Sequence, residues 1–256
     1  MSKIYEPQGK AREYSPLALN YITGCDHGCR YCYVPNILGR FNSKYVHNEV
    51  KININYAEIA RSAEKMQGCG KQILLSFTTD PYCSSVQNET RKVLEILNFY
   101  GHKVAILTKG GSRCLPDIDM FKQFGDRIKI GATLTFDNNT DSLAWEPGAA
   151  LPEDRISSLR TLHDAGIKTW VSFEPVIIPE QSLNLMTRIP FIDHVKVGKL
   201  NNYKGLDKNI DWKAFLINSV NYLRYNDIKF YIKKDLAVFY PEYLKPNEID
   251  ADLLSL

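Results

Sequence analysis

Short apolar runs rich in β-branched residues alternate along this 256-residue chain with longer segments whose apolar residues recur at the spacing of a helix. Repeated strand–helix units of this kind place their strands parallel in one sheet, with helices packed against it. We therefore predict an α/β fold of six strand–helix units. The predicted strands cover residues 17–23, 73–77, 103–108, 127–136, 168–173 and 194–198, with 228–232 as a candidate further strand. The predicted helices cover residues 56–66, 88–100, 117–124, 152–165, 183–188 and 211–225.

No stretch rich in Gly, Ser or Pro divides the chain, so we expect one domain over residues 1–256, with a core of about 17–225 and a C-terminal extension of 226–256. Six parallel units form either an open doubly wound sheet or a partly closed barrel. In a barrel, the reactive groups lie at the carboxyl ends of the strands. Polar residues here follow that rule: a cysteine-rich loop succeeds the first strand, and at or after later strand ends stand Thr79, Asp80, Lys109, Thr135 and Glu174.

The composition excludes several other classes of protein. An apolar fraction of 44% is ordinary for a globular chain and excludes a disordered or fibrous one. No run approaches the roughly 20 apolar residues that span a bilayer, and residues 1–7 lack the apolar segment of a signal peptide. We therefore expect a cytoplasmic protein. A net charge of +3 permits a nucleic-acid partner without requiring one.

The decisive segment is residues 23–33, which hold three of the six cysteines of the chain. Cys25, Cys29 and Cys32 are close enough in sequence for their thiolates to converge on one metal centre, with a fourth ligand position left open. An iron–sulfur cube with three protein ligands keeps one iron free for a substrate. A zinc site completed by His27 is the alternative, although structural zinc usually pairs its ligands and no second pair occurs here.

This cysteine spacing after a first strand resembles the radical S-adenosylmethionine (SAM) superfamily, and further segments resemble its spore photoproduct lyase-like branch. That branch has tyrosines on both sides of its third cysteine, as Tyr31 and Tyr33 are placed here. Its polar strand-end motif is similar to residues 77–80, and its Thr–Lys motif to residues 107–109. A strand of that branch matches residues 133–135, and its paired Glu–Pro and Arg motif is similar to residues 145–148 and 152–155. The resemblance runs from about residue 21 to about residue 179.

The resemblance implies a partial (β/α)6 barrel of the TIM type that binds a [4Fe-4S] cluster through Cys25, Cys29 and Cys32. It also implies that SAM is cleaved reductively to methionine and a 5′-deoxyadenosyl radical, which abstracts hydrogen from a substrate. The electrons would come from a donor such as flavodoxin or ferredoxin. The SAM contacts that it implies are Thr79, Asp80, Lys109, Thr133 and Thr135.

Several of these candidates also have a structural explanation. Tyr33 and Cys83 are candidate hydrogen-atom relays, together with Tyr31, but all three equally suit packing. Phe77 stands where the lyase has its hydrogen-donor cysteine, and Cys83 a few residues later is the candidate substitute; this departure argues against a thymine-dimer substrate. Asp80 suits either a ligand amino group or the cap of its own turn.

The substrate is the least constrained feature of the sequence. The lyase-like branch suggests a DNA lesion, and phosphates or bases would suit a basic segment near the sixth expected strand. That segment holds Lys196, Lys199, Asn201, Asn202, Tyr203, Lys204 and Lys208. A solvated basic loop explains the same residues. A peptide or small-metabolite substrate remains an alternative, as does a zinc- or iron–sulfur-stabilised nucleic-acid-binding protein without catalysis.

Overall fold

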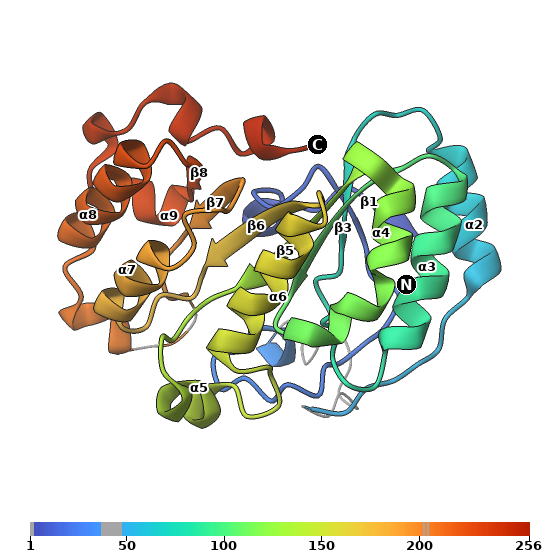
Figure 1. Cartoon of the computed structure of the whole chain (residues 1–256), viewed down its shortest axis with the longest axis horizontal. Coiled ribbons are helices and arrows are strands. Elements are labelled where there is room, and N and C mark those ends of the chain that lie inside the picture. The colour runs from blue at the N-terminus through green and yellow to red at the C-terminus, as the bar shows by residue number, and fades with distance from the viewer. Residues whose placement is uncertain (1–2, 37–47, 202, 204) are drawn as a thin grey trace.

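One sheet organises the computed structural model, which describes residues 3–36, 48–201, 203 and 205–256 (Figure 1). Within these residues the sheet has eight strands in sequence order, and β1 and β8 are its unpaired edges. The first pair is antiparallel and all later pairs are parallel. The strands are β1 (Ile4–Tyr5), β2 (Leu17–Leu19), β3 (Gln72–Leu75), β4 (Lys103–Thr108), β5 (Ile128–Thr133), β6 (Lys168–Phe173), β7 (His194–Val197) and β8 (Lys229–Ile232).

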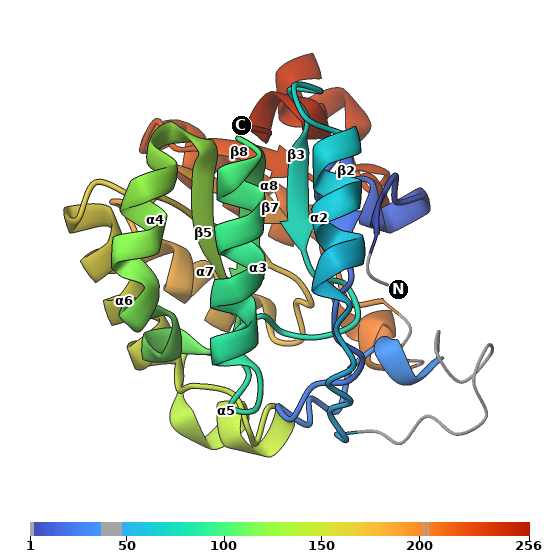
Figure 2. The same cartoon turned by 90° about the vertical axis from the view of Figure 1, so that its right-hand side faces the viewer.

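Helices form the outer layer of the molecule, and Figure 2 shows α2, α3 and α4 standing in front of the strands. Among the helices of the described ranges, none combines the length and apolar character that a membrane-spanning helix requires. The helices are α2 (Tyr56–Lys65), α3 (Gln87–Phe99), α4 (Ile118–Phe124), α5 (Asn139–Trp145), α6 (Pro152–Asp164), α7 (Pro179–Thr187), α8 (Trp212–Tyr225) and α9 (Lys234–Ala237).

The predicted α/β alternation is confirmed, and the candidate strand at 228–232 is present as β8. The first predicted strand is shorter than expected, because the side chain of Asn20 accepts from Phe77 N at 2.8 Å and from Ser76 Oγ at 3.1 Å just beyond β2. The short strand β1 and the helix α5 were not predicted. Asn138 starts α5 by accepting from Asp141 N at 2.9 Å, a local cap that the sequence contains.

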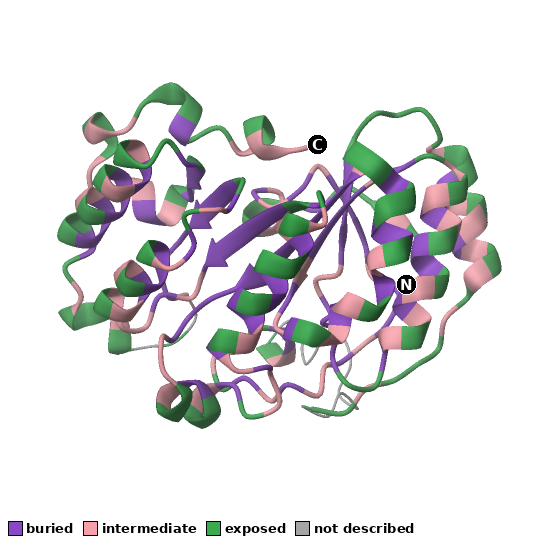
Figure 3. Cartoon of the chain, in the orientation of Figure 1, coloured by how far each residue is buried: buried purple, intermediate pink, exposed green. Residues whose placement is uncertain are grey.

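Two apolar clusters fill the space between the sheet and the helices, and Figure 3 shows the strands buried while the helices expose their outer faces. A third cluster lies on the other face of the sheet, around Trp170. A Cβ at Gly131 would lie 2.5 Å from the Trp170 ring, so glycine in β5 makes room for this indole. Its Nε1 donates to Ile106 O at 3.0 Å, which ties β6 to β4 across the inner face.

The segment before β2 reaches from one edge region of the sheet to the other. Lys196 in β7 is buried, and its Nζ donates to Glu13 O at 2.7 Å and to Tyr14 O at 3.2 Å. Tyr231 in β8 donates its hydroxyl to Glu13 Oε2 at 2.9 Å. The rings of Tyr14, Tyr231 and Trp170 surround the Lys196 ammonium at 5.5, 5.6 and 5.9 Å from their centroids. The segment before β2 thus contacts β7 and β8, to which β2 is not paired within the described sheet.

The buried Lys196 predicts a distinct pH dependence of stability. Burial, followed by the neighbouring charge of Lys233, lowers the pKa of Lys196 from 10.5 to about 7. Above pH 7 the unfolded chain holds a proton there that the folded chain has lost, so the free energy of unfolding rises with pH up to about pH 10, by at most about 1.4 kcal/mol per unit. Urea unfolding at pH 7, 8 and 9 should show this rise in the wild type relative to Lys196→Met. Parallel curves would contradict it.

Candidate functional site

The cysteine loop leaves the carboxyl end of β2 and is held by backbone contacts. Gly24 N donates to Thr78 O at 3.0 Å, and Gly24 has φ of +92°. A Cβ at Gly24 would lie 1.9 Å from the carbonyl oxygen of Glu49, so only glycine fits at this crossing. Farther along, Arg30 N donates to Trp145 O at 2.9 Å. The loop is therefore fixed to the end of β3, to the segment around Glu49 and to the end of α5.

The three thiols of this loop suit a metal group. None of them forms a disulfide with a described residue. Cys29 is 6% exposed, and burial raises the pKa of its thiol to about 12, although the charge of Lys109 opposes this. Burial also raises the pKa of Cys32, again against Lys109. Coordination to a metal removes a thiol proton outright, so an iron centre bound here would supply the charge that ionises these ligands.

The positions of the three sulfur atoms bear on whether the loop would bind a single metal ion or a cluster. Three thiolates on one zinc ion stand about 3.8 Å apart when each lies ~2.3 Å from the metal. The sulfurs of Cys25, Cys29 and Cys32 do not all lie within 4.8 Å of one another. Irons of a cluster take one thiolate each, so thiols that do not converge within this distance are compatible with a cluster.

Cys25 takes part in a tighter group that does not suit a metal ion. Its sulfur, that of Cys83 and a carboxylate oxygen of Asp26 lie within 4.8 Å of one another. The Asp26 carboxylate already accepts from Ser84 N at 3.1 Å and from Ser85 N at 3.0 Å. A hydrogen bond with Cys83, followed by burial, raises the pKa of the Cys25 thiol. Asp26 thus fastens the loop to the segment after β3.

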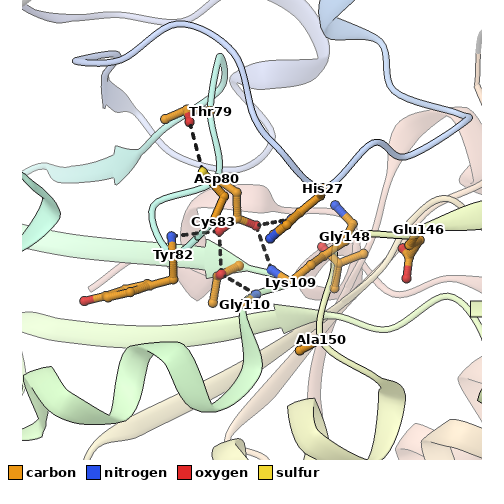
Figure 4. Close-up of polar contacts among 12 residues, drawn as sticks. His27, Thr79, Asp80, Tyr82, Cys83, Lys109, Gly110, Glu146, Gly148 and Ala150 are labelled. Atoms are coloured by element: carbon orange, nitrogen blue, oxygen red, sulfur yellow. Dashed lines mark hydrogen bonds and ion pairs between the residues drawn. The ribbon is translucent and has the colours of Figure 1, made fainter. Parts of the chain in front are cut away.

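Asp80 is the junction between the cysteine loop and two strand ends (Figure 4). Its Oδ1 accepts from Thr108 Oγ1 at 2.5 Å and from Tyr82 N at 2.9 Å. Its Oδ2 accepts from Lys109 N at 2.7 Å and lies 3.4 Å from Nδ1 of His27. Both oxygens of this buried carboxylate are therefore occupied by the protein, which favours the capping role over direct contact with a ligand.

Lys109 brings an ammonium group to the cysteine loop. Its Nζ lies 5.8 Å from the centroid of the Tyr31 ring, and no described residue accepts a hydrogen bond from it. Burial alone would lower its pKa, but the negative charges of Cys29, Glu146 and Asp80 raise it above the ordinary value. Lys109 is therefore a permanent cation whose three donors remain available to an anionic ligand.

A buried ion pair braces the opposite wall of the site. Arg155 donates from Nη2 to Glu146 Oε2 at 2.5 Å and from Nη1 to Thr133 O at 3.0 Å, and both side chains are about 1% exposed or less. The hydroxyl of Tyr31 donates to the second oxygen of Glu146 and lies 3.5 Å from Thr135 Oγ1. This network connects the cysteine loop to the end of β5, where Thr133 and Thr135 are both buried.

The predicted relay residues lie in different environments. Tyr33 is 39% exposed and donates its hydroxyl to Phe77 O at 2.8 Å. Cys83 is fully buried, with its sulfur near Cys25 and 4.0 Å from Thr79 Oγ1. The structure thus brings the predicted cysteines, threonines, Asp80, Lys109 and the three relay candidates to the carboxyl ends of β2 to β5.

Comparison with known proteins identifies the family. The family model described as "Radical SAM superfamily" matches residues 19–187. The chain belongs to the radical SAM superfamily. Two curated relatives are themselves uncharacterized proteins: ORF301 of Acidianus two-tailed virus, 28% identical over 64% of this chain and 57% of its own, and MJ0683 of Methanocaldococcus jannaschii, 24% identical over 82% and 86%. The chain thus spans little more than half the length of the viral relative.

Solved structures with the same fold include other radical SAM proteins. A spore photoproduct lyase complexed with dinucleoside spore photoproduct superposes with a TM-score of 0.68 at 14% identity, over 89% of this chain and 78% of its own. Streptococcus suis SuiB bound to S-adenosylmethionine superposes with a TM-score of 0.65 at 15% identity, over 88% and 52%. At such identities the likeness concerns the fold, and it confirms the predicted α/β architecture of the partial-barrel kind.

A second polar cluster of this radical SAM chain was not predicted as a group. At the ends of β6 and β8, Lys233 donates to Glu174 Oε2, and both are covered from solvent. The hydroxyl of Tyr14 donates to the same oxygen at 2.5 Å, and Asn201 Nδ2 donates to Oε1 at 3.0 Å. Tyr14 also contacts the Phe77 ring, 6.3 Å between centroids, beside the cysteine loop. Tyr14 precedes the expected core, so no local pattern placed it here.

The basic segment near β7 is only partly available to a nucleic acid. Lys196, counted in this basic segment from the sequence, is not available to a nucleic acid, because its ammonium is buried against backbone carbonyls. Lys199 lies 3.7 Å from Asp207. Lys208 and Tyr203 are exposed, and the Tyr203 ring stands 5.5 Å from that of Trp145. Of the three other members of the predicted segment, Asn201 donates to Glu174, and Asn202 and Lys204 lie outside the described residues.

Proposed function

We propose that this chain is a radical SAM enzyme that cleaves SAM reductively and uses the product radical to abstract hydrogen from a substrate. The observation that carries the proposal is the cysteine loop, with Cys29 buried and Lys109 beside it. When bound, a [4Fe-4S] cluster supplies the electron for this cleavage, which yields methionine and a 5′-deoxyadenosyl radical. The protein supplies orientation and excludes water. We further propose that residues 1–256 act as a single domain.

Cys25, Cys29 and Cys32 are the proposed cluster ligands, and Lys109 is the proposed anchor for the carboxylate of SAM. An ammonium is a compact donor with three hydrogens, and here none is used by a described residue. The hydroxyl groups of Thr79, Thr133 and Thr135 are proposed to bind the other polar groups of SAM. Asp80 acts on the ligand indirectly, because it fixes the backbone of Lys109.

Loss of the Lys109 charge should weaken SAM binding. A hydrogen bond to a charged group contributes about 1.5–3 kcal/mol, so we expect Lys109→Met to raise the dissociation constant for SAM roughly 10- to 150-fold. Equilibrium dialysis with cluster-loaded protein measures this directly. Lys92→Met, which removes an exposed lysine from α3, is the matched control and should bind like the wild type. Equal affinity in Lys109→Met would remove Lys109 from the proposed site.

Hydrogen-atom transfer after radical formation is proposed to involve Tyr33. Its ring is partly exposed, and its hydroxyl lies on the Phe77 carbonyl at the end of β3. Cys83 remains the second proposed relay, although it is fully buried behind Cys25 and Thr79. Deuterium transfer from labelled solvent into product, compared between Tyr33→Phe and Cys83→Ala, separates the two residues.

The experiment that tests the function is anaerobic reconstitution with iron and sulfide, reduction, and addition of SAM. We expect 5′-deoxyadenosine and methionine to form. A loaded and reduced cluster that yields neither product would contradict the proposal. A flavodoxin or ferredoxin is the proposed physiological electron donor, and its replacement of the chemical reductant in the same assay tests that partner.

The proposed substrate is a damaged nucleobase in DNA. Exposed Lys208 and Tyr203, with Trp145 behind the tyrosine ring, offer a phosphate contact and a stacking surface. The structurally similar spore photoproduct lyase is complexed with a dinucleoside spore photoproduct. Because SuiB is bound to the precursor peptide SuiA, a peptide is the second candidate substrate. Ultraviolet-irradiated DNA in the SAM assay should lose lesions. An unchanged lesion count would exclude this substrate and favour a peptide or metabolite.

A further inference from the structure

His27 lies between two proposed cluster ligands in the sequence, and its buried imidazole lies beside the Cys25 thiol and also contacts groups outside the loop. It is 1% exposed, and it belongs to the part of the cysteine loop between Cys25 and Cys29. Its Nε2 lies 3.1 Å from Nη1 of Arg113, and its Nδ1 lies 3.4 Å from Oδ2 of Asp80 (Figure 4). The imidazole thus joins this loop to two groups outside it.

The chemistry of Arg113 fixes the tautomer of the ring. A guanidinium group only donates hydrogen bonds, so the Nε2 atom of His27 must accept. A neutral imidazole then carries its proton on Nδ1, which faces Asp80. This Nδ1 is buried, and no hydrogen bond of ordinary geometry satisfies it among the described residues. An unsatisfied buried N–H costs about 1–3 kcal/mol, so the position of Nδ1 beside the Asp80 carboxylate is unfavourable for stability by itself.

The Asp80 oxygen that faces His27 also accepts from Lys109 N at 2.7 Å. One carboxylate therefore contacts both the middle of the cysteine loop and the residue proposed to hold SAM. Arg113 strengthens the connection, since its Nη2 donates to Gly148 O at 3.1 Å while Gly148 N donates to His27 O at 2.8 Å.

Other contacts of the cysteine loop lead elsewhere. Asp26 binds the segment after β3 through Ser84 and Ser85, and the backbone of Arg30 binds the end of α5. Within the described residues, His27 is the side chain of the interval from Cys25 to Cys29 that reaches toward the end of β4.

We propose that His27 is a positioning residue that sets the cysteine loop relative to Lys109, and through them the cluster relative to SAM. This inference rests on the proposed function. Its consequence is geometric: the distance between an electron source and its acceptor depends on one imidazole–carboxylate contact. His27 is not itself a proposed ligand of either group and acts through Asp80 and the cysteine loop.

Three substitutions separate the two sides of the ring. In His27→Asn, the amide nitrogen occupies about the place of Nδ1 and keeps a donor toward Asp80. In His27→Gln, the amide reaches about the place of Nε2 and keeps only the contact with Arg113. His27→Ala removes both. The control is His163→Ala. His163 also lies near a carboxylate, 3.9 Å from Asp193, but its side chain is far more exposed than that of His27.

The measurements are iron content, the rate of 5′-deoxyadenosine formation, and the change that SAM causes in the electron paramagnetic resonance spectrum of the reduced cluster. We expect equal iron in all variants. His27→Ala and His27→Gln should lose 10- to 100-fold in rate and most of the SAM-induced spectral change, whereas His27→Asn should remain within about threefold of the wild type. If His27→Asn is as defective as His27→Ala, or if His27→Ala keeps the spectral change, the proposal is overturned.

A second measurement does not depend on the reaction. In the cluster-free chain, amide hydrogen exchange at residues 24–30 and at Lys109 should accelerate at least tenfold in His27→Ala and His27→Gln but not in His27→Asn. Unchanged exchange in all variants would refute the contact even if SAM is cleaved. If the variants show this exchange pattern but the wild type forms no 5′-deoxyadenosine, the proposed reaction is refuted, and the contact of His27 with Asp80 still stands.

Discussion

Replacement of Cys29 by alanine is expected to abolish cluster binding and to reduce 5′-deoxyadenosine formation to background. Cys29 is the most buried thiol of the triplet. The cube then loses one of its three protein ligands, and the nearby carboxylates of Asp26 and Asp80 are already used in hydrogen bonds. Cys25→Ala and Cys32→Ala should have the same effect.

Iron and sulfide analysis, together with the visible absorbance of the reconstituted protein, measures this loss. Cys69→Ala is the matched control, because Cys69 is an exposed thiol outside the site and its removal should change neither iron content nor product. Retention of iron and sulfide by Cys29→Ala would contradict the ligand assignment. One tightly bound zinc per chain, without sulfide, would favour the nucleic-acid-binding alternative.

The order of the strands was predictable because the chain alternates two periodicities, and parallel units in sequence neighbour one another in space. Element ends were less predictable. The apolar run at 17–23 continues past β2, but Asn20 binds the backbone after β3 and takes the chain out of the sheet. The two residues of β1 carry too short a pattern to be distinguished from a loop.

The site was predictable to the level of location, since carboxyl strand ends converge on one rim. Whether a polar strand-end residue faces a ligand or the protein was not predictable, because that depends on partners far away in sequence. The two carboxylate oxygens of Asp80 accept hydrogen bonds from Thr108 and Lys109. Lys196 lies in the predicted strand 194–198 and was grouped with the basic residues that follow it. It shares one face of β7 with His194, and Tyr14, which no local pattern connects to it, covers its ammonium.

Arg155→Met is expected to destabilise the fold by about 3–5 kcal/mol, because it leaves the Glu146 carboxylate buried without its main partner. Arg155 also donates from Nε to Ala150 O at 2.7 Å and from Nη1 to Thr133 O at 3.0 Å, so two buried carbonyl groups lose a donor as well. Urea unfolding at pH 7 measures the loss. Lys168→Ala is the control, since it removes an exposed pair with Asp126 and should cost at most about 1 kcal/mol.

The pH dependence of this defect distinguishes an uncompensated charge from lost packing. Burial would raise the pKa of Glu146, but Arg155 and Lys109 outweigh it and hold the pKa below the ordinary value of 4.5. The wild type therefore keeps this stabilisation above about pH 4.5 and loses it as the pH falls further. Without Arg155 the pKa rises, so the folded variant takes up a proton at Glu146 and its deficit should shrink between pH 7 and pH 5. Arg155→Met combined with Glu146→Gln should recover part of the loss at pH 7 for the same reason. A deficit that is independent of pH and unchanged in the double variant would attribute the effect to packing instead.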